Sequence, residues 1–198
     1  MIEQERGDHT VITPSTSFVY KSKLTAEDLS FVKELAEHSR NNEEFGSNLA
    51  GNILEQRSGV GTSMEKQQKL FSIFSQHVEH FVKYERQQEQ VNGFNVEALW
   101  FNYMKANEFN PLHSHSGYIS GIVMIDVPLE IAEELNEDIK TNARCPGHLE
   151  FVCDKDIHRV SPVEGEIYLF KSDFKHQVYP FKSMVERITM SWNITEVY

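Results

Sequence analysis

The chain has 198 residues, of which 39% are apolar, and this composition is typical of a folded protein rather than a disordered one. Its formal net charge of −11 and its lack of a basic run argue against binding to nucleic-acid phosphates. The two cysteines, Cys145 and Cys153, do not form the closely spaced pairs of a zinc knuckle or the dense framework of a disulfide scaffold.

The N-terminal residues are charged and lack the apolar segment of a signal peptide. No apolar run approaches the ~18 residues that a membrane-spanning helix requires. We therefore expect a cytoplasmic protein without a membrane anchor. The length suits a single domain, 1–198, with a sizeable buried core.

The first half, 1–95, is predicted to be mainly helical after a loosely alternating segment at 11–20. Thr25 has the features of a helix cap, followed by acidic residues and an apolar stripe that extend to about residue 40. The segment 63–90 carries the longest pattern of apolar residues at helical spacing. Between the helices, 41–62 is predicted to be a loop, and its polar side chains are either solvated or line a substrate entrance: Glu43, Glu44, Asn48, Asn52 and Arg57.

The second half, 96–198, changes to short segments rich in β-branched and aromatic residues. These segments predict strands at 96–104, 118–127, 148–153, 166–170, 177–181 and 186–194. Turns are predicted at 110–111, 146–147 and 162–165. Helices followed by a run of strands, without parallel βαβ alternation, indicate an α+β fold around a sandwich or jelly roll. An acidic insert at about 129–147 is either a solvated loop or a lid over the barrel mouth.

Two histidines stand two residues apart at His113 and His115. In an extended strand such residues point to the same face, so both imidazoles could reach one point. His176 follows a later predicted strand and supplies a third imidazole. Neutral imidazole nitrogens bind Fe, Zn, Cu and Ni, so the pattern predicts a metal site.

The last predicted strand has one polar face and one apolar face. Its polar face begins with Arg187, whose planar guanidinium is suited to paired hydrogen bonds with a carboxylate, and Thr189 could share this contact. The alternative is an arginine that pairs with a surface acid such as Glu186 or Asp173.

Together, these segments resemble the 2-oxoglutarate- and Fe(II)-dependent oxygenases, and in particular a bacterial and phage group with a His-x-His motif. The resemblance extends over about 96–193. Each part of the pattern is weak alone, but the order and spacing of the parts are specific. The shared positions include Trp100, Asn102, Asn110, His113, His115, Ser120, Gly121, Pro128, Gly165, Leu169, Phe170, Ser172, His176, Val178, Pro180, Phe181, Arg187 and Asn193.

The resemblance implies a double-stranded β-helix, the cupin-like jelly roll, with the N-terminal helices packed on its outer face. It also implies a dioxygenase that hydroxylates an unidentified substrate with release of succinate and CO₂. The implied ligands of Fe(II) are His113, His115 and His176. The implied contacts of 2-oxoglutarate are Arg187 and Thr189, with Asn102 and Tyr103 as further candidates and Tyr118 and Ser120 as weaker ones.

His115 stands where most of the superfamily has a carboxylate. The metal could therefore have three histidine ligands, or two with water, chloride, Asp173 or a distant carboxylate (Glu150, Glu164 or Glu166). Two other functions stay open, namely a cupin-like metalloenzyme that does not use 2-oxoglutarate and a non-enzymatic jelly-roll module. We expect a small-molecule or peptide substrate, and exposed strand edges are compatible with a homodimer.

Overall fold

The computed structural model describes residues 2–6, 9–13, 18–59, 63–87, 91–136, 145–153 and 156–198. Its helices are α1 (Ala26–Ser39), η1 (Gly46–Asn48), α2 (Met64–Arg86), α3 (Leu129–Glu133) and η2 (Glu134–Asn136). Its strands are β1 (Ile2–Arg6), β2 (His9–Thr13), β3 (Val19–Lys23), β4 (Gln56–Ser58), β5 (Phe94–Met104), β6 (Asn110–His113), β7 (Ile119–Asp126), β8 (Leu149–Cys153), β9 (Asp156–Val160), β10 (Glu166–Lys171), β11 (His176–Val178) and β12 (Arg187–Val197).

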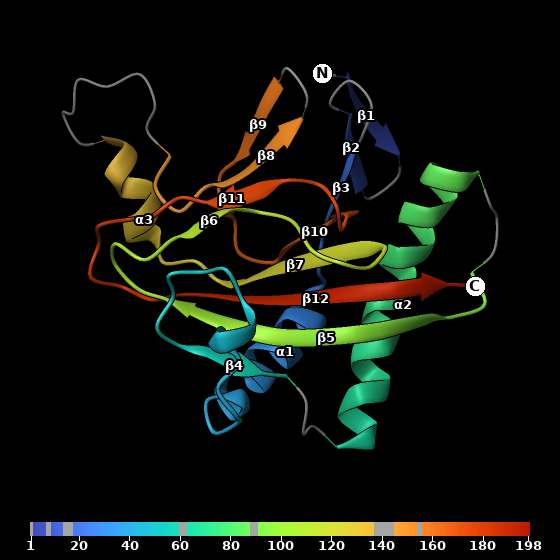
Figure 1. The fold of residues 1–198 in the computed structure, drawn as a ribbon, viewed down its shortest axis with the longest axis horizontal. Coiled ribbons are helices and arrows are strands. Elements are labelled where there is room, and N and C mark those ends of the chain that lie inside the picture. Colours follow the sequence, from blue (N-terminus) through green and yellow to red (C-terminus); the bar gives the residue numbers. More distant parts are fainter. Residues whose placement is uncertain are drawn as a thin grey trace.

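The strands form two antiparallel sheets that face each other. The larger sheet has eight strands in the order β1-β2-β3-β10-β7-β12-β5-β4, and the smaller has four in the order β6-β11-β8-β9. Figure 1 shows the smaller sheet above the long strands β7, β12 and β5. This arrangement confirms the predicted α+β fold with a jelly-roll core.

Helices α1 and α2 cover the face of the larger sheet that points away from the smaller one (Figure 1). The strict alternation along β12 explains this packing, because Met190 and Trp192 join the core shared with the helices. The ring of Trp192 stacks on Phe74 of α2, with ring centroids 4.1 Å apart. Since neighbouring side chains of a strand point to opposite faces, the polar residues of β12 must face the smaller sheet.

A second apolar core lies between the two sheets. Phe151 of β8 packs edge-on against Phe170 of β10, with ring centroids 5.0 Å apart. Other buried members of this core come from both sheets: Val19, Ile122, Met124, Leu149, Val160 and Tyr168. The core fills one part of the sandwich interior and leaves the polar side chains of β12 facing a pocket.

Both N-terminal helices begin as predicted. The hydroxyl groups of Thr25 and Ser63 each accept a hydrogen bond from a backbone amide in the first turn of α1 and α2. No helix in the described part of the chain has the length and apolar character needed to cross a membrane.

Several strands were not predicted, among them β1, β4, β6 and β9. β4 lies in the segment 41–62, which was expected to be a loop, and it pairs with β5. β6 contains Asn110 and Pro111, which were expected to form a turn; proline is tolerated because β6 is an edge strand of the smaller sheet. β9 pairs with β8 as a short exposed edge. Of the acidic insert, 129–136 forms α3 and η2, whereas 137–144 lies outside the described residues.

Candidate active site

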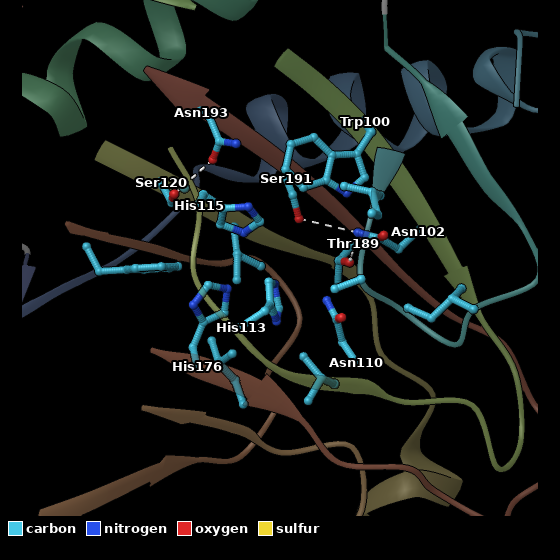
Figure 2. A pocket seen from close by; sticks show the side chains of 18 of the residues that line it. Trp100, Asn102, Asn110, His113, His115, Ser120, His176, Thr189, Ser191 and Asn193 are labelled. Atoms are coloured by element: carbon cyan, nitrogen blue, oxygen red, sulfur yellow. Dashed lines mark hydrogen bonds between the residues drawn. The ribbon is translucent and has the colours of Figure 1, made fainter. Parts of the chain in front are cut away.

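Three histidines converge between the two sheets. His113 ends β6, and its backbone pairs directly with that of His176 in β11. His115 lies beyond the end of β6, where its backbone amide donates a hydrogen bond to the Ser172 carbonyl. One ring nitrogen from each imidazole lies within 4.8 Å of the others, and Figure 2 shows the three rings grouped on one side of the pocket.

Backbone carbonyls orient two of these rings. The Nδ1 atom of His113 lies 2.6 Å from the Pro111 carbonyl oxygen, and that of His176 lies 2.9 Å from the Phe174 carbonyl oxygen. In a neutral imidazole the Nδ1–H donates to such a carbonyl, so Nε2 keeps its lone pair. Both rings therefore present Nε2 as the ligand atom, which is how protein carbonyls commonly orient metal-binding histidines.

The environment keeps all three imidazoles neutral. Burial lowers the pKa of His176 to about 3, and the neighbouring His113 and His115 contribute to the shift. Burial and the nearby His113 lower the pKa of His115 to about 4, and burial also lowers the pKa of His113. Since only neutral imidazole binds a metal, the three side chains are ready to do so at neutral pH.

Carboxylates do not join this cluster among the described residues. Glu150 accepts a hydrogen bond from Arg159 at 2.5 Å, Glu164 pairs with Lys33 at 2.9 Å and Glu166 pairs with Lys21 at 2.7 Å. Asp173 is exposed. The donor set that the structure offers a metal is thus three neutral nitrogens, which fits Fe(II) and leaves the whole charge of the ion uncompensated by the protein.

Arg187 lies in the same pocket and is 3% exposed. Its Nη1 donates to the Gly147 carbonyl oxygen at 2.5 Å, and its Nη2 contacts the Met104 sulfur at 3.0 Å. Its Nε is buried without an acceptor among the described residues. Burial lowers the pKa of this guanidinium to about 10. Glu186, considered above as a partner, pairs instead with Arg40 at 2.5 Å.

This arginine is a buried positive charge without a carboxylate partner in the described structure. Burying an unpaired ion is costly, so such a group is expected to pair with a ligand. A planar guanidinium in a pocket with a metal site fits a carboxylate of 2-oxoglutarate. The residues present therefore fit both the metal and the co-substrate.

Asn102 and Thr189 line the same pocket on the face of the larger sheet (Figure 2). The Asn102 amide nitrogen donates to the Thr189 hydroxyl at 3.1 Å and to the Ser191 hydroxyl at 3.3 Å. Its amide oxygen accepts from the Gln56 side chain at 2.6 Å. Asn102 is thus fully engaged by protein groups, and it orients the two hydroxyl groups that face the pocket.

Tyr103 is not brought into the pocket, contrary to our expectation. It follows Asn102 in β5 and so points to the opposite face, where its hydroxyl contacts the Ala36 carbonyl and Ser39 of α1. Tyr118 is likewise directed away, with its hydroxyl hydrogen-bonded to Glu85 of α2. The weaker candidate Ser120 does line the pocket, where it donates to the Asn193 side chain at 2.8 Å.

The segment before β4 forms part of the pocket wall. The polar residues of this segment, for which solvation and an entrance role were both left open, do not line the pocket; Leu49, Ala50 and Ile53 contribute instead. Sequence reasoning also gave no role to the side chain of Asn110 or to Trp100, which contacts the His115 ring at a centroid distance of 5.8 Å. Both residues occur in the motif pattern described above, and this pattern could have indicated that they belong to the site.

Comparison with known proteins agrees with this geometry. Residues 98–193 match the family described as "Putative 2OG-Fe(II) oxygenase", and this range contains the three histidines and Arg187. The chain belongs to the 2OG-Fe(II) oxygenases. No curated protein sequence matches it closely enough to count as a relative.

Solved structures of other 2OG-Fe(II) oxygenases share the fold. A prolyl-4-hydroxylase from Pseudomonas putida is 15% identical, with 92% of this chain and 95% of that chain covered and a TM-score of 0.58. A 2OG-Fe(II) oxygenase family oxidoreductase from Burkholderia pseudomallei is 10% identical, with 89% and 84% covered and a TM-score of 0.59. A prolyl hydroxylase from Trichoplax adhaerens, solved with a peptide fragment of hypoxia inducible factor, is 12% identical, with 88% and 82% covered and a TM-score of 0.56.

Proposed function

We propose that this 2OG-Fe(II) oxygenase is a hydroxylase in which His113, His115 and His176 hold Fe(II) and Arg187 holds the distal carboxylate of 2-oxoglutarate. The observation that carries the proposal is the buried Arg187 guanidinium, which faces the histidine pocket and has no carboxylate partner in the described structure. The substrate is proposed to be a small molecule or a peptide, and the protein to act in the cytoplasm.

When bound, Fe(II) and 2-oxoglutarate supply the activation of O₂ that converts a substrate C–H bond to C–OH, with release of succinate and CO₂. The residues of the chain bind and orient these reactants. Arg187 neutralises one carboxylate, and the Thr189 and Ser191 hydroxyls, both fixed by Asn102, offer further hydrogen bonds. The apolar side chains Leu49 and Ile53 help to exclude water from the pocket.

Proteins of the same fold include hydroxylases, but they do not decide the reaction or name the substrate. Two of the similar structures are prolyl hydroxylases, whereas two others are an epimerase and a carbocyclase from nogalamycin biosynthesis. Function therefore depends on the site rather than on the fold. The neutral three-histidine donor set is the feature of this site that sets it apart from a site with a carboxylate ligand.

The proposal is tested by anaerobic titration of the metal-free protein with Fe(II) and then 2-oxoglutarate. We expect a saturable, weak visible charge-transfer band from the chelated keto acid. Arg187→Met should weaken 2-oxoglutarate binding by on the order of 2–5 kcal/mol because it removes a buried charged partner, while Fe(II) affinity is retained. If Fe(II) binds and no band forms even in the wild type, a cupin-like enzyme that does not use 2-oxoglutarate is the better description.

A further inference from the structure

Asn110 is a polar residue of the pocket to which the proposed function gives no role. It begins β6, three residues before His113, and its side chain lines the pocket. Its Oδ1 atom is buried and has no hydrogen-bond partner among the described residues. Buried polar atoms without partners are rare in native proteins, so this amide calls for a ligand.

The surroundings of Asn110 place its amide close to the proposed co-substrate site. A Cβ atom at Gly51 would lie 3.4 Å from Asn110 Oδ1 and 3.6 Å from Gln56 Nε2. Gln56 in turn donates to Asn102, which orients Thr189. The Asn110 amide therefore lies near the end of the pocket where these polar groups gather.

Figure 2 shows the Asn110 amide next to His113 and directed toward Thr189 across the pocket. Asn110 belongs to the smaller sheet, whereas Thr189 belongs to the larger one. Asn110 therefore lines the pocket beside His113 and opposite Thr189. A ligand that reaches from the histidines to Arg187 and Thr189 would come close to its amide.

We propose that the side-chain amide of Asn110 hydrogen-bonds 2-oxoglutarate from the smaller sheet, opposite Thr189. This inference rests on the proposed function, because it assumes that 2-oxoglutarate is the ligand that connects the histidines to Arg187. Rotation of the amide by half a turn exchanges its NH₂ and oxygen positions, so the side chain can present a donor to a carboxylate. Asn110 is a binding residue in this proposal and has no role in metal ligation.

The experiment is isothermal titration calorimetry of the anaerobic Fe(II)-loaded protein with 2-oxoglutarate. Asn110→Leu keeps the size of the side chain but removes its hydrogen bonds, and we expect affinity to fall about tenfold or more. Asn110→Asp keeps the shape and places a carboxylate against the bound one, so we expect a larger loss than with Asn110→Leu. Fe(II) affinity, measured separately, should stay within about twofold of the wild type in both variants.

Asn52→Asp is the matched control. Its side chain is exposed and its backbone bridges to Phe109, the residue before Asn110, so it adds the same charge close by without entering the pocket. We expect its affinity for 2-oxoglutarate to stay within about twofold of the wild type, because an exposed charge is strongly screened. A loss equal to that of Asn110→Asp would mean that charge alone explains the effect, and would overturn the proposal.

Three other results would overturn the inference in distinguishable ways. If the wild type binds 2-oxoglutarate and both Asn110 variants bind it equally well, Asn110 does not contact the co-substrate and the proposed function stands. If both variants lose Fe(II) and 2-oxoglutarate together, the residue holds β6 in place rather than binding a ligand. If the wild-type protein binds Fe(II) but no 2-oxoglutarate, the proposed function and this inference fail together.

Discussion

At the scale of single residues, the donor set of the metal site is the feature with the largest chemical consequence. His113 and His176 are fixed by strand pairing and by carbonyl contacts at Nδ1, whereas His115 lies beyond the strand. With a histidine at this position, the described part of the chain gives the metal no negatively charged ligand. The ion then keeps its full positive charge for anionic ligands, including 2-oxoglutarate.

Substitution of His115 tests whether this position is a ligand. We expect His115→Ala to weaken Fe(II) binding by at least about tenfold. Loss of a group that only hydrogen-bonds to a metal ligand already has an effect of this size, and loss of the ligand itself should cost no less. We expect His115→Asp to retain Fe(II), because two histidines and one carboxylate also form an iron site. Affinity is measured by anaerobic Fe(II) titration. Unchanged affinity in His115→Ala would show that water or another small ligand completes a two-histidine site.

At the scale of secondary-structure elements, β12 separates the chemistry of the site from the packing of the helices. Arg187 and Thr189 line the pocket on one face, while Met190 and Trp192 join the helix-side core on the other. The same alternation in β5 puts Asn102 on the pocket face and Tyr103 against α1. Each long strand therefore serves both as a wall of the site and as a support for the helices.

The stacking of Trp192 on α2 depends on the lack of a side chain at Gly121. A Cβ atom at this position in β7 would lie 2.2 Å from the Trp192 ring, which is too close for any real contact. We expect Gly121→Ala to lower the free energy of unfolding by about 1–3 kcal/mol, the usual cost of overpacking a core. The measurement is urea unfolding followed by circular dichroism.

Gly51→Ala provides the comparison for Gly121→Ala. The nearest atom to a Cβ at Gly51 is 3.4 Å away, which is an ordinary contact distance. Its stability should therefore stay close to that of the wild type. Equal stability of the two variants would show that the Trp192 ring moves aside at little cost, contrary to the packing described here.

At the scale of the whole molecule, burial of the histidines couples folding to pH. In the folded protein, burial and the nearby imidazoles lower the pKa of His176 to about 3 and that of His115 to about 4. Unfolding exposes these groups and returns their pKa values to about 6.5. Between about pH 4 and 6.5 the unfolded chain thus binds more protons than the folded one. The contribution of these neutral histidines to the free energy of unfolding is fully present above about pH 6.5 and is lost as the pH falls.

This coupling is measured as the free energy of unfolding of the metal-free protein at pH 7.5 and at pH 5. We expect the wild type to be less stable at pH 5. His176→Gln should show a smaller loss between the two pH values, because it lacks one of the titrating imidazoles. The same comparison removes the contribution of buried carboxylates, which both proteins share. An identical pH dependence in the two proteins would contradict the predicted neutral state of His176.

The two sheets and the two helices also explain why we expect 1–198 to form one domain. The strands that carry the site have one face in the pocket and the other in a core shared with α1 and α2. Without the N-terminal helices, the apolar face of β12 would be exposed to water. The helical part and the jelly-roll part therefore describe the order of elements along the chain. That they fold together as one domain stays a prediction.

The sequence by itself determined the elements with strong periodic patterns and the residue types of the site. The alternation along 187–194 predicted both faces of β12, and the cap at Thr25 predicted the start of α1. The order and spacing of the motifs over about 96–193, with the histidines and Arg187 among them, indicated the 2OG-Fe(II) oxygenases. The strand pattern and the helix cap depend on local backbone geometry, which neighbouring residues in the chain control.

Only the tertiary structure decided which side chains meet in the pocket. β4 and β6 are short strands held by pairing with distant partners, and such pairing leaves little pattern in the local sequence. Whether Asn102 or Tyr103 faced the pocket depended on the register of β5 against its neighbours, because a shift of one residue exchanges the two faces. Two other features were likewise visible only once both sheets were in place: the Asn110 Oδ1 atom lacks a hydrogen-bond partner, and the Arg187 guanidinium lacks a carboxylate partner, among the described residues.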